Sequence, residues 1–284
     1  MISTKIKFID IKNTISNTTM KNQLAVQLYT VRDFLNTSSD VAQTFAKIRE
    51  IGYPAVQLSA VGAMTGDNPE LDAKTARQIL DDTGLKCIAT HRSWDDLVHK
   101  TEEEIEFHQI LGCDFTAIGS MPNLWSEGGN TAQKYRDFLM ESAPVIAKLK
   151  AAGLRFGYHN HAAEFVRQGF EAGHPVTNFD IFIEEGNPDF LLELDLYWVG
   201  HAGVNPERIV ERCAGRMPVI HIKDKEMHGN EPRMAPIGEG NLDWRNLIPA
   251  CQKSGVEWIA IEQDTCYRDP FDCLKSSFDY LAAF

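Results

Sequence analysis

The sequence predicts an α/β protein that folds as a single-domain (β/α)8 barrel. Short apolar segments of strand character alternate eight times with helical patterns, at intervals of about 30 to 40 residues, and this alternation requires parallel strands with helical crossovers. The length of 284 residues suits one such barrel, which typically takes about 250 residues. The alternative, a doubly wound open sheet, lacks its G-x-G-x-x-G fingerprint, because the first strand continues as AVQLYTVRD.

Eight strands and eight helices are expected along the chain. The strands are predicted at residues 23–30, 55–59, 86–91, 115–120, 155–160, 190–196, 218–224 and 257–264. The helices are predicted at residues 39–52, 72–84, 101–113, 131–153, 178–186, 206–215, 242–255 and 269–284. Several helical segments stop at a glycine shortly before the next strand, which is a normal C-terminal cap.

The predicted domain organisation is an N-terminal extension, residues 1–22, followed by one barrel domain, residues 23–284. No linker or low-complexity segment divides the barrel. The extension contains lysines but no continuous apolar core, so it does not resemble a signal peptide. Met20 directly precedes the first expected strand. The preceding residues are therefore either an extension, ordered or disordered, or the product of a misassigned start.

Composition narrows the classes of partner and compartment. The net charge is −12, and such an acidic chain gains nothing from approaching a phosphate backbone, so nucleic acid is disfavoured. No run approaches the roughly 18 apolar residues of a membrane span. Six scattered cysteines without a Cys-x-x-Cys pair indicate reduced thiols in a cytoplasmic protein. A small neutral molecule is the expected partner, and a homo-oligomer is left open.

Charged and imidazole side chains recur at the ends of the last four predicted strands. In a barrel of this type, catalytic groups come from the C-terminal ends of the strands, and charged residues inside strands need a reason. Alternation places one pair on one face of each strand: His159 and His161, Glu193 and Asp195, His221 and Lys223, and Glu262 and Asp264. A mixed set of imidazoles and carboxylates suits Mn, Co, Zn, Fe or Mg, in no order that the sequence fixes.

Each of these residues also has a simpler interpretation. A lone aspartate at a strand end commonly caps a turn or helix, and a lone strand histidine is commonly a hydrogen-bonded core residue. Glu262 is harder to explain in this way, because a buried glutamate requires a partner. The coincidence in register on neighbouring strands favours a shared metal site formed by Asp195, His221 and Glu262, with His159 as the fourth ligand.

Five segments together resemble the xylose isomerase-like TIM-barrel superfamily, and within it the sugar phosphate isomerase/epimerase branch. They read GYHNHAAEF, ELDLYWVGHAGVNP, VIHIKDK, PIGEGNLDW and WIAIEQD. The resemblance covers nearly all of the chain after residue 22. It implies a divalent metal, often Mn, held by Glu, Asp, His and Glu. The last three positions correspond to Asp195, His221 and Glu262, whereas the first glutamate appears here as His159, which makes a symmetric two-glutamate mechanism doubtful.

The expected chemistry is proton removal next to a carbonyl. A divalent ion that chelates a carbonyl and a neighbouring hydroxyl stabilises the enediolate that forms. Glu262, His161 and Glu164 are candidates for the base, and Lys223 for stabilising the oxyanion. Candidate substrate-binding residues follow the third, fourth and sixth strands: His91, Trp94, Trp125, Tyr197 and Trp198. No basic cluster accompanies the glycine-rich segment GEGNLDW, so a phosphorylated substrate is not indicated.

The sequence therefore predicts a divalent-metal-dependent isomerase or epimerase acting on a sugar or keto-sugar. Mn is the first choice of metal, ahead of Zn, Co, Mg or Fe. The alternatives are a keto-sugar dehydratase or hydratase-type lyase on the same site, and a non-catalytic sugar-binding barrel that has lost its metal. An endonuclease IV-like phosphodiesterase is disfavoured, because it would need a basic DNA-binding face and the chain carries a charge of −12.

Overall fold

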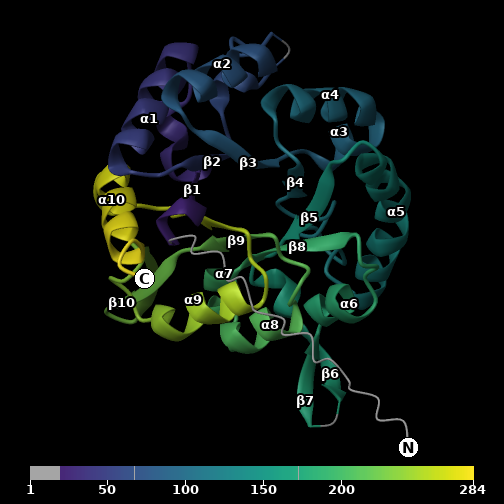
Figure 1. Ribbon diagram of the computed structural model, residues 1–284. Coiled ribbons are helices and arrows are strands. Elements are labelled where there is room, and N and C mark those ends of the chain that lie inside the picture. Colours follow the sequence, from purple (N-terminus) through teal and green to yellow (C-terminus); the bar gives the residue numbers. More distant parts are fainter. Residues whose placement is uncertain (1–19, 67, 172) are drawn as a thin grey trace, which may run out of the picture.

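A closed barrel of parallel strands forms the centre of the molecule (Figure 1). The computed structural model describes residues 20–66, 68–171 and 173–284, and within them eight strands pair in the order in which they follow along the chain. These strands are β1 (Leu24–Gln27), β2 (Ala55–Leu58), β3 (Lys86–His91), β4 (Phe115–Ile118), β5 (Arg155–His159), β8 (Phe190–Asp195), β9 (Val219–Ile222) and β12 (Trp258–Ile261). The predicted α/β barrel in one domain is confirmed.

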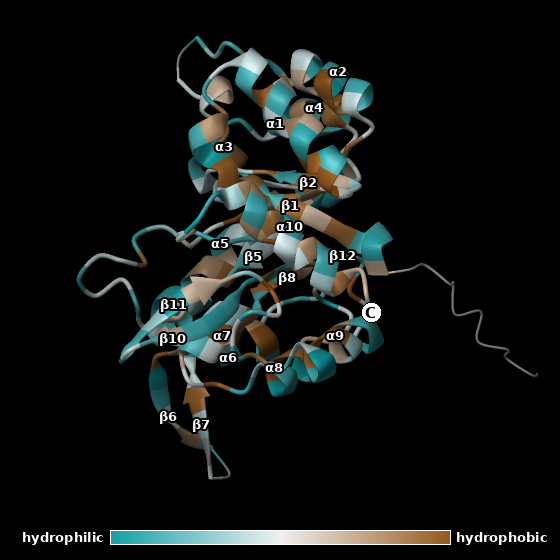
Figure 2. Cartoon of the chain, turned by 90° about the vertical axis from the view of Figure 1, so that its left-hand side faces the viewer, coloured by the Kyte–Doolittle hydropathy of each residue, from teal (hydrophilic) through white to brown (hydrophobic). Residues whose placement is uncertain are grey.

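Helices surround the barrel on all sides (Figure 1). The eight predicted ones are α1 (Ser38–Ile51), α2 (Ala73–Thr83), α4 (Thr101–Leu111), α5 (Ala132–Ala151), α6 (Asn178–Glu184), α8 (Pro206–Arg212), α9 (Trp244–Lys253) and α10 (Pro270–Leu281). Short elements not predicted from the sequence are α3 (Trp94–His99), α7 (Leu196–His201) and the 3-10 turns η1 (Met20–Gln23), η2 (Leu28–Phe34), η3 (Gly62–Met64) and η4 (Ala163–Phe165). Figure 2 shows hydrophilic and hydrophobic residues alternating along these helices.

Two antiparallel hairpins, also missed from the sequence, extend from the barrel. One joins β6 (Arg167–Glu171) to β7 (His174–Thr177), and the other joins β10 (Asp224–His228) to β11 (Glu231–Ala235). They follow β5 and β9, so both belong to the end of the barrel at which the parallel strands finish. The β6–β7 hairpin projects away from the body of the molecule in Figures 1 and 2.

The first helix illustrates how local sequence sets the boundaries of the elements. A reciprocal capping box between Thr37 and Asp40 starts α1, since each side chain bonds to the other residue's backbone amide. Gly52 ends the helix with φ at 125°, a conformation that other residues rarely adopt. A Cβ at Gly52 would also lie 2.6 Å from the ring of Phe278 on α10, so glycine allows α1 and α10 to pack closely.

Two apolar clusters fill the molecule. The larger lies between the strands and the helices, and the smaller lies inside the barrel and consists of Ala25, Ala55, Ile88, Ala89, Phe115, Ala117, Val219 and Ala260. Phe115 is the aromatic member of this interior cluster, and its ring fits there because the neighbouring strand has Gly157, where a Cβ would lie 2.4 Å from the ring. Small residues on several strands thus accommodate one aromatic ring, and the polar residues stand beyond it at the strand ends.

The expected N-terminal extension comprises residues 1–22, of which residues 1–19 lie outside the described part of the chain. Its last residues form η1 (Met20–Gln23), and the side chain of Met20 is buried. Among the described residues, none of the helices combines the length and the apolar character needed to cross a bilayer.

Candidate metal centre at the strand ends

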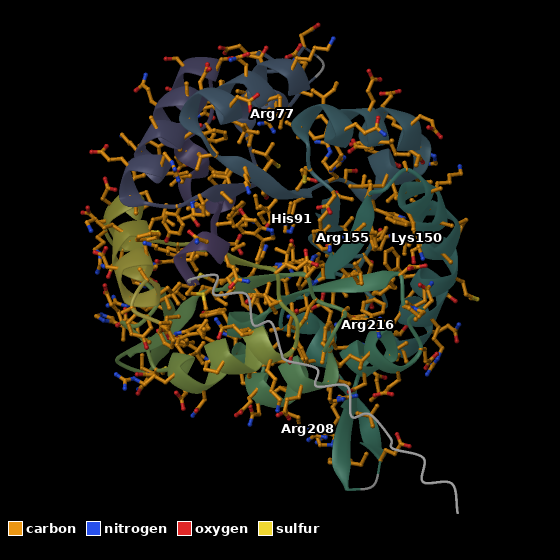
Figure 3. The ribbon with its side chains drawn as sticks, viewed as in Figure 1. Arg77, His91, Lys150, Arg155, Arg208 and Arg216 are labelled. Atoms are coloured by element: carbon orange, nitrogen blue, oxygen red, sulfur yellow. The ribbon has the colours of Figure 1, made fainter. Side chains whose placement is uncertain are left out.

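Seven ionisable side chains meet at the C-terminal ends of the barrel strands. We name this group the strand-end cluster: His91 of β3, His159 of β5, Glu193 and Asp195 of β8, His221 of β9, Lys223 directly after β9, and Glu262 directly after β12. All are buried except His91, which is partly exposed. In Figure 3, His91 lies near the centre of the ring of strands, whereas Arg77 lies at its periphery among the helices.

The pairing of the strands brings these residues to one level. His159 is the register partner of Glu193, and Asp195 is the register partner of His221. Because side chains alternate along a strand, Glu193 and Asp195 face the barrel axis together. Leu192 and Leu194, on the other face of β8, are fully buried in the larger apolar cluster. The alternation predicted for this strand therefore holds in the structure.

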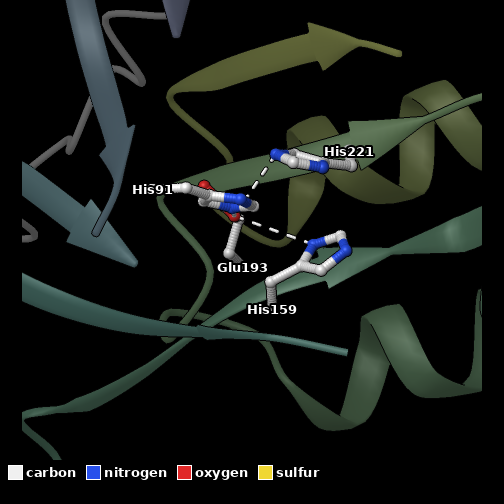
Figure 4. Close-up of side chains that lie close together, drawn as sticks. All are labelled: His91, His159, Glu193 and His221. Atoms are coloured by element: carbon white, nitrogen blue, oxygen red, sulfur yellow. Dashed lines mark hydrogen bonds and ion pairs between the residues drawn. The ribbon is translucent and has the colours of Figure 1, made fainter. Parts of the chain in front are cut away.

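The four metal ligands predicted from the sequence lie together. Ligand atoms of His159, Asp195, His221 and Glu262 are all within 4.8 Å of one another. Among the described residues, a second group with the same spacing combines His91, His159, Glu193 and His221 (Figure 4). The two groups share both central histidines. The described residues therefore offer two overlapping sets of side chains that could hold one divalent ion.

Several features of the cluster fit a cation. Asp195 caps α7 through Oδ1, which accepts from the Trp198 amide at 3.0 Å, while its buried Oδ2 forms an ion pair with Lys223, whose Nζ lies 3.0 Å away. The buried Nδ1 of His159 has no hydrogen-bond partner among the described groups. Buried polar atoms are rarely left unpaired, so the ring of His159 is one partner short. Two imidazoles and two carboxylates form a donor set suited to Zn, Mn, Fe or Co.

Lys223 already provides one positive charge inside the cluster. Its Nζ lies 3.0 Å from Asp195 Oδ2 and 3.0 Å from Asp264 Oδ1, and it also donates to Glu262. The side chain is almost completely buried and lies 5.7 Å from the centre of the Trp198 ring. One lysine faces these three carboxylates and the nearby Glu193, so fixed negative charge exceeds fixed positive charge.

The histidines differ in their charge states. Burial lowers the pKa of His159 well below its usual range, and the neighbouring His221 and His161 lower it further. Burial, together with Lys223, lowers the pKa of His161 to about 4. Both rings are therefore neutral near pH 7. Burial also acts to lower the pKa of His221, but Glu193 and Glu262 outweigh it and raise the pKa to about 10.

The pKa values of the three carboxylates also differ from one another. Burial raises the pKa of Asp195 to about 6, although Lys223 opposes this. Burial acts in the same direction on Glu262, but Lys223 and His221 outweigh it and hold the pKa of Glu262 well below its ordinary value. Glu193 is likewise buried, and the neighbouring His221 and His91 lower its pKa to about 2. A metal ion would replace the proton on His221, since a ligand imidazole must be neutral.

A cleft of about 350 Å³ opens above the cluster. Pockets for small molecules range from about 300 to 1,000 Å³, so this one suits a ligand of the size of a simple sugar. Its lining consists of Gln27, Tyr29, Ser59, Ala60, His91, Gly119, His159, His161, Lys223, Glu262 and Asp264. The predicted base candidates His161 and Glu262 and the predicted cation Lys223 thus share one cavity with His91.

The four predicted aromatic residues fall into two groups. Trp198 and Trp125 both lie against His161, with ring centres 5.5 and 5.7 Å away, so they flank the cleft. Trp94 instead packs edge-on against Phe138 in the helix layer. Tyr197 is buried, and its ring stacks on His201. None of the four is part of the lining of the cleft itself, and Trp125 and Trp198 reach it only through their contact with His161.

Glu164 is fully buried but does not line the cleft. Its Oε1 accepts from the Tyr158 hydroxyl at 2.9 Å, and its Oε2 accepts from the His161 backbone amide at 2.8 Å. Burial raises the pKa of Glu164 to about 7. Both oxygens are therefore occupied in holding the turn that carries His161, and the structure does not bring Glu164 to the strand-end cluster.

No role was predicted for three polar residues that the structure places in or beside the cluster. Glu193 and Asp264 were recognised only as sharing a face with Asp195 and Glu262, and that alternation was the available signal. Gln57 of β2 is fully buried and bonds to both Glu193 and His221. A glutamine within the apolar run AVQLS was the only local sign of it.

The sequence model of one protein family, described as the xylose isomerase-like TIM barrel, matches residues 45–283. The chain belongs to this family. No curated protein sequence matches the chain. The predicted superfamily is confirmed by the family model, and the predicted branch agrees with the names of the solved structures that resemble the protein.

Three of these solved structures illustrate the range of the fold. A sugar phosphate isomerase/epimerase from Parabacteroides distasonis has a TM-score of 0.74 and 20% identity, over 97% of this chain and 98% of that one. An L-ribulose 3-epimerase has a TM-score of 0.65 and 15% identity, over 92% and 93%. The probable 3-DHS dehydratase AsbF from Bacillus anthracis has a TM-score of 0.67 and 13% identity, over 91% and 98%. All three therefore share the barrel fold of this chain.

Proposed function

We propose that the protein is a divalent-metal-dependent isomerase or epimerase that acts on a sugar or keto-sugar by removing a proton next to a carbonyl. The observation that carries the proposal is the convergence of His159, Asp195, His221 and Glu262 beneath a cleft that also contains His161 and Lys223. Membership of the xylose isomerase-like family and the isomerase and epimerase names of structural neighbours support it.

The ion would be held by His159, Asp195, His221 and Glu262, with Mn proposed first and Zn, Co, Mg or Fe as alternatives. When bound, such an ion polarises the substrate carbonyl and stabilises negative charge on its oxygen. The donor set supports this assignment, because two imidazoles and two carboxylates whose ligand atoms lie within 4.8 Å of one another suit a divalent transition metal.

Other side chains in or beside the cleft are proposed to accept the proton, stabilise the oxyanion and contact the sugar. Glu262 and neutral His161 are the groups able to accept the proton, since both line the cavity and, near pH 7, Glu262 is ionised and His161 has one unprotonated ring nitrogen. The Lys223 ammonium donates hydrogen bonds and can stabilise the oxyanion. Trp125 and Trp198 flank His161 and offer apolar surface to the face of a sugar ring.

A second candidate, a keto-sugar dehydratase or related lyase, is favoured by one residue. The family's first metal-binding glutamate is replaced here by His159. An epimerase that works with two opposed glutamates loses one of them by this change. Elimination needs only one base and one acid for the leaving group, and His161 and Lys223 can fill these roles. The dehydratase among the structural neighbours is consistent with this alternative.

Deuterium exchange followed by NMR tests the proposal without assuming the product. The purified protein is incubated in deuterated water with a panel of keto-sugars, with Mn²⁺ and, in parallel, after removal of metal by a chelator. Metal-dependent exchange at the carbon next to the carbonyl is expected. A new epimer or isomer identifies the first candidate, and an unsaturated or ring-opened product identifies the second. Exchange that is absent, or that is unaffected by the chelator, contradicts the proposal.

A further inference from the structure

The two overlapping ligand groups pose a choice that hydrogen bonds can decide. Both use His159 and His221, and the first is completed by Asp195 and Glu262, the second by His91 and Glu193 (Figure 4). An imidazole binds an ion through one nitrogen while the other nitrogen donates its proton to a neighbouring acceptor. The partner of that second nitrogen therefore determines which group holds the ion.

Gln57 determines the orientation of His221. Its Nε2 donates to Glu193 Oε1 at 2.8 Å, and its Oε1 lies 2.7 Å from His221 Nε2. A carboxylate has no hydrogen to donate, so the amide NH2 must face Glu193, and the amide oxygen must face His221. His221 Nε2 consequently carries a proton. Only Nδ1, which lies 3.1 Å from Glu262, remains to bind an ion.

Glu193 serves as a common acceptor for the histidines. Its Oε1 is occupied by Gln57, and its Oε2 faces Nε2 of His91 at 2.5 Å and Nε2 of His221 at 3.2 Å. The same oxygen is 3.7 Å from Nδ1 of His159, so this nitrogen faces Glu193 although the distance is too long for a hydrogen bond. The opposite nitrogen of His159, Nε2, lies 4.0 Å from Asp195.

The backbone of β2 supports this position of Gln57. The register between β2 and β3 shifts at Val56 and Gln57, whose partners are Cys87 and Ala89, so one residue of β3 is left over. Bulges of this kind re-aim side chains beside functional sites. Gln27, the register partner of Gln57 on β1, accepts from the Tyr29 amide instead. The two glutamines thus stand side by side with different partners.

We propose that Gln57 and Glu193 form a positioning pair that makes His221 bind the ion through Nδ1 and His159 through Nε2, while Glu193 stays outside the ligand set. The inference rests on the proposed metal dependence. It assigns the ion to the group with Asp195 and Glu262. Glu193 becomes the carboxylate behind the histidines, the place where partners of metal-bound imidazoles commonly stand.

Histidine NMR of the Zn²⁺-loaded protein reads this arrangement directly. With ¹⁵N-labelled histidine, the wild type is expected to bind one ion, with His221 metallated at Nδ1 and protonated at Nε2. Gln57→Met keeps the volume but removes both hydrogen bonds. It should lower the Zn²⁺ affinity by about 10- to 100-fold and abolish the protected Nε2 proton. Gln27→Met removes the neighbouring buried amide, which bonds to no histidine among the described residues, and as the matched control it should leave the His221 Nε2 proton in place.

Carboxamide substitutions provide a second test that does not depend on Gln57→Met folding. Glu193→Gln should weaken Zn²⁺ binding while one ion per chain is still bound, whereas Asp195→Asn, which keeps the cap of α7, should abolish measurable binding. The reverse order, or a wild-type His221 metallated at Nε2, overturns the inference and leaves the proposed function standing. A wild-type protein that binds no divalent ion overturns the proposed function, and this inference with it.

Discussion

The two ends of the barrel have clefts of the same volume, about 350 Å³, but charges of different kinds. At the N-terminal end, Arg155 pairs with both Asp114 and Glu257, and Lys150 pairs with Asp189. These side chains are a third or more exposed. Water and counter-ions screen such pairs, which typically contribute about 1 kcal/mol or less to stability.

At the C-terminal end, the charges are buried and unbalanced. Asp195, Glu193 and Lys223 are almost completely inaccessible to water, and carboxylates outnumber the single lysine. Burying ions in this way is expensive unless each has a partner. The volume of the cleft therefore does not distinguish the proposed functional end of this barrel from the other end. The property that distinguishes it is a group of charged side chains buried away from water.

The largest expected effect comes from Glu262, which directly follows β12 at the C-terminal end of the barrel. Glu262→Gln is nearly isosteric but removes the negative charge that serves as ligand and candidate base. Deuterium exchange next to the substrate carbonyl should fall at least by the roughly 10²- to 10⁴-fold that general-base catalysis contributes. Glu257→Gln, at the other end of the same strand, should leave exchange unchanged. Undiminished exchange in the Glu262 variant would remove that residue from the chemistry.

A smaller effect is expected from His159→Ala. The variant loses one proposed ligand but keeps Asp195, His221 and Glu262, so metal affinity should fall at least by the roughly 10- to 100-fold typical of outer partners. Some activity should return at high metal concentration. Equilibrium dialysis with Mn²⁺ measures the affinity. His108→Ala, at a buried histidine of α4 that bonds to Thr90, is the control. Equal Mn²⁺ affinity in wild type and His159→Ala would contradict the assignment.

The third prediction concerns stability and pH. The pKa of Glu164 is raised to about 7 in the fold, against about 4.3 in an unfolded chain. Its favourable contribution is complete below the unfolded pKa and is lost as pH rises through the folded pKa. Between pH 5 and 8, wild type should therefore lose roughly 2 kcal/mol more stability than Glu164→Gln. Urea unfolding at both pH values measures this difference, and parallel pH profiles for the two proteins would refute it.

The smallest effect is expected at the N-terminal end. Arg155→Met breaks the pairs with Asp114 and Glu257 but keeps an apolar stem against the barrel. Unfolding free energy should fall by about 1 kcal/mol or less, and high salt should reduce the difference. Metal affinity and deuterium exchange should stay at wild-type values. A loss of stability as large as that of a buried pair, about 3 to 5 kcal/mol, would erase the contrast between the two ends.

Much of this architecture could be predicted because it depends on local patterns. Strand and helix alternation predicted the barrel, and the period of two in the sixth predicted strand placed Asp195 on the same face as Glu193. The β10–β11 hairpin was missed although its signal is present. His228 pairs with Glu231 across Gly229, whose φ is 63°, and a two-residue Gly-Asn turn between strands is a recognised hairpin motif.

Other features depend on contacts between distant segments, which one sequence does not reveal. Gln57 meets His221 across a separation of 164 residues, and its orientation depends on an irregular register between β2 and β3. The hydrogen bond from the Tyr158 hydroxyl to Glu164 forms only because the turn after β5 folds back onto that strand. Lys223 was predicted as an oxyanion partner, but its contacts with three carboxylates follow from the closure of the barrel.

The buried ammonium of Lys223 also allows the barrel to fold before any metal ion binds. Small zinc domains fold only as their metal binds, because nothing else neutralises their ligands. Here Lys223 already offsets Asp195 and Glu262, so the newly made chain can complete its barrel without waiting for an ion. The proposed ion would then enter a finished pocket, beside a cation that belongs to the chain. Under the proposed function, the identity of that ion would depend on supply at the time of loading as well as on the preference of the ligands.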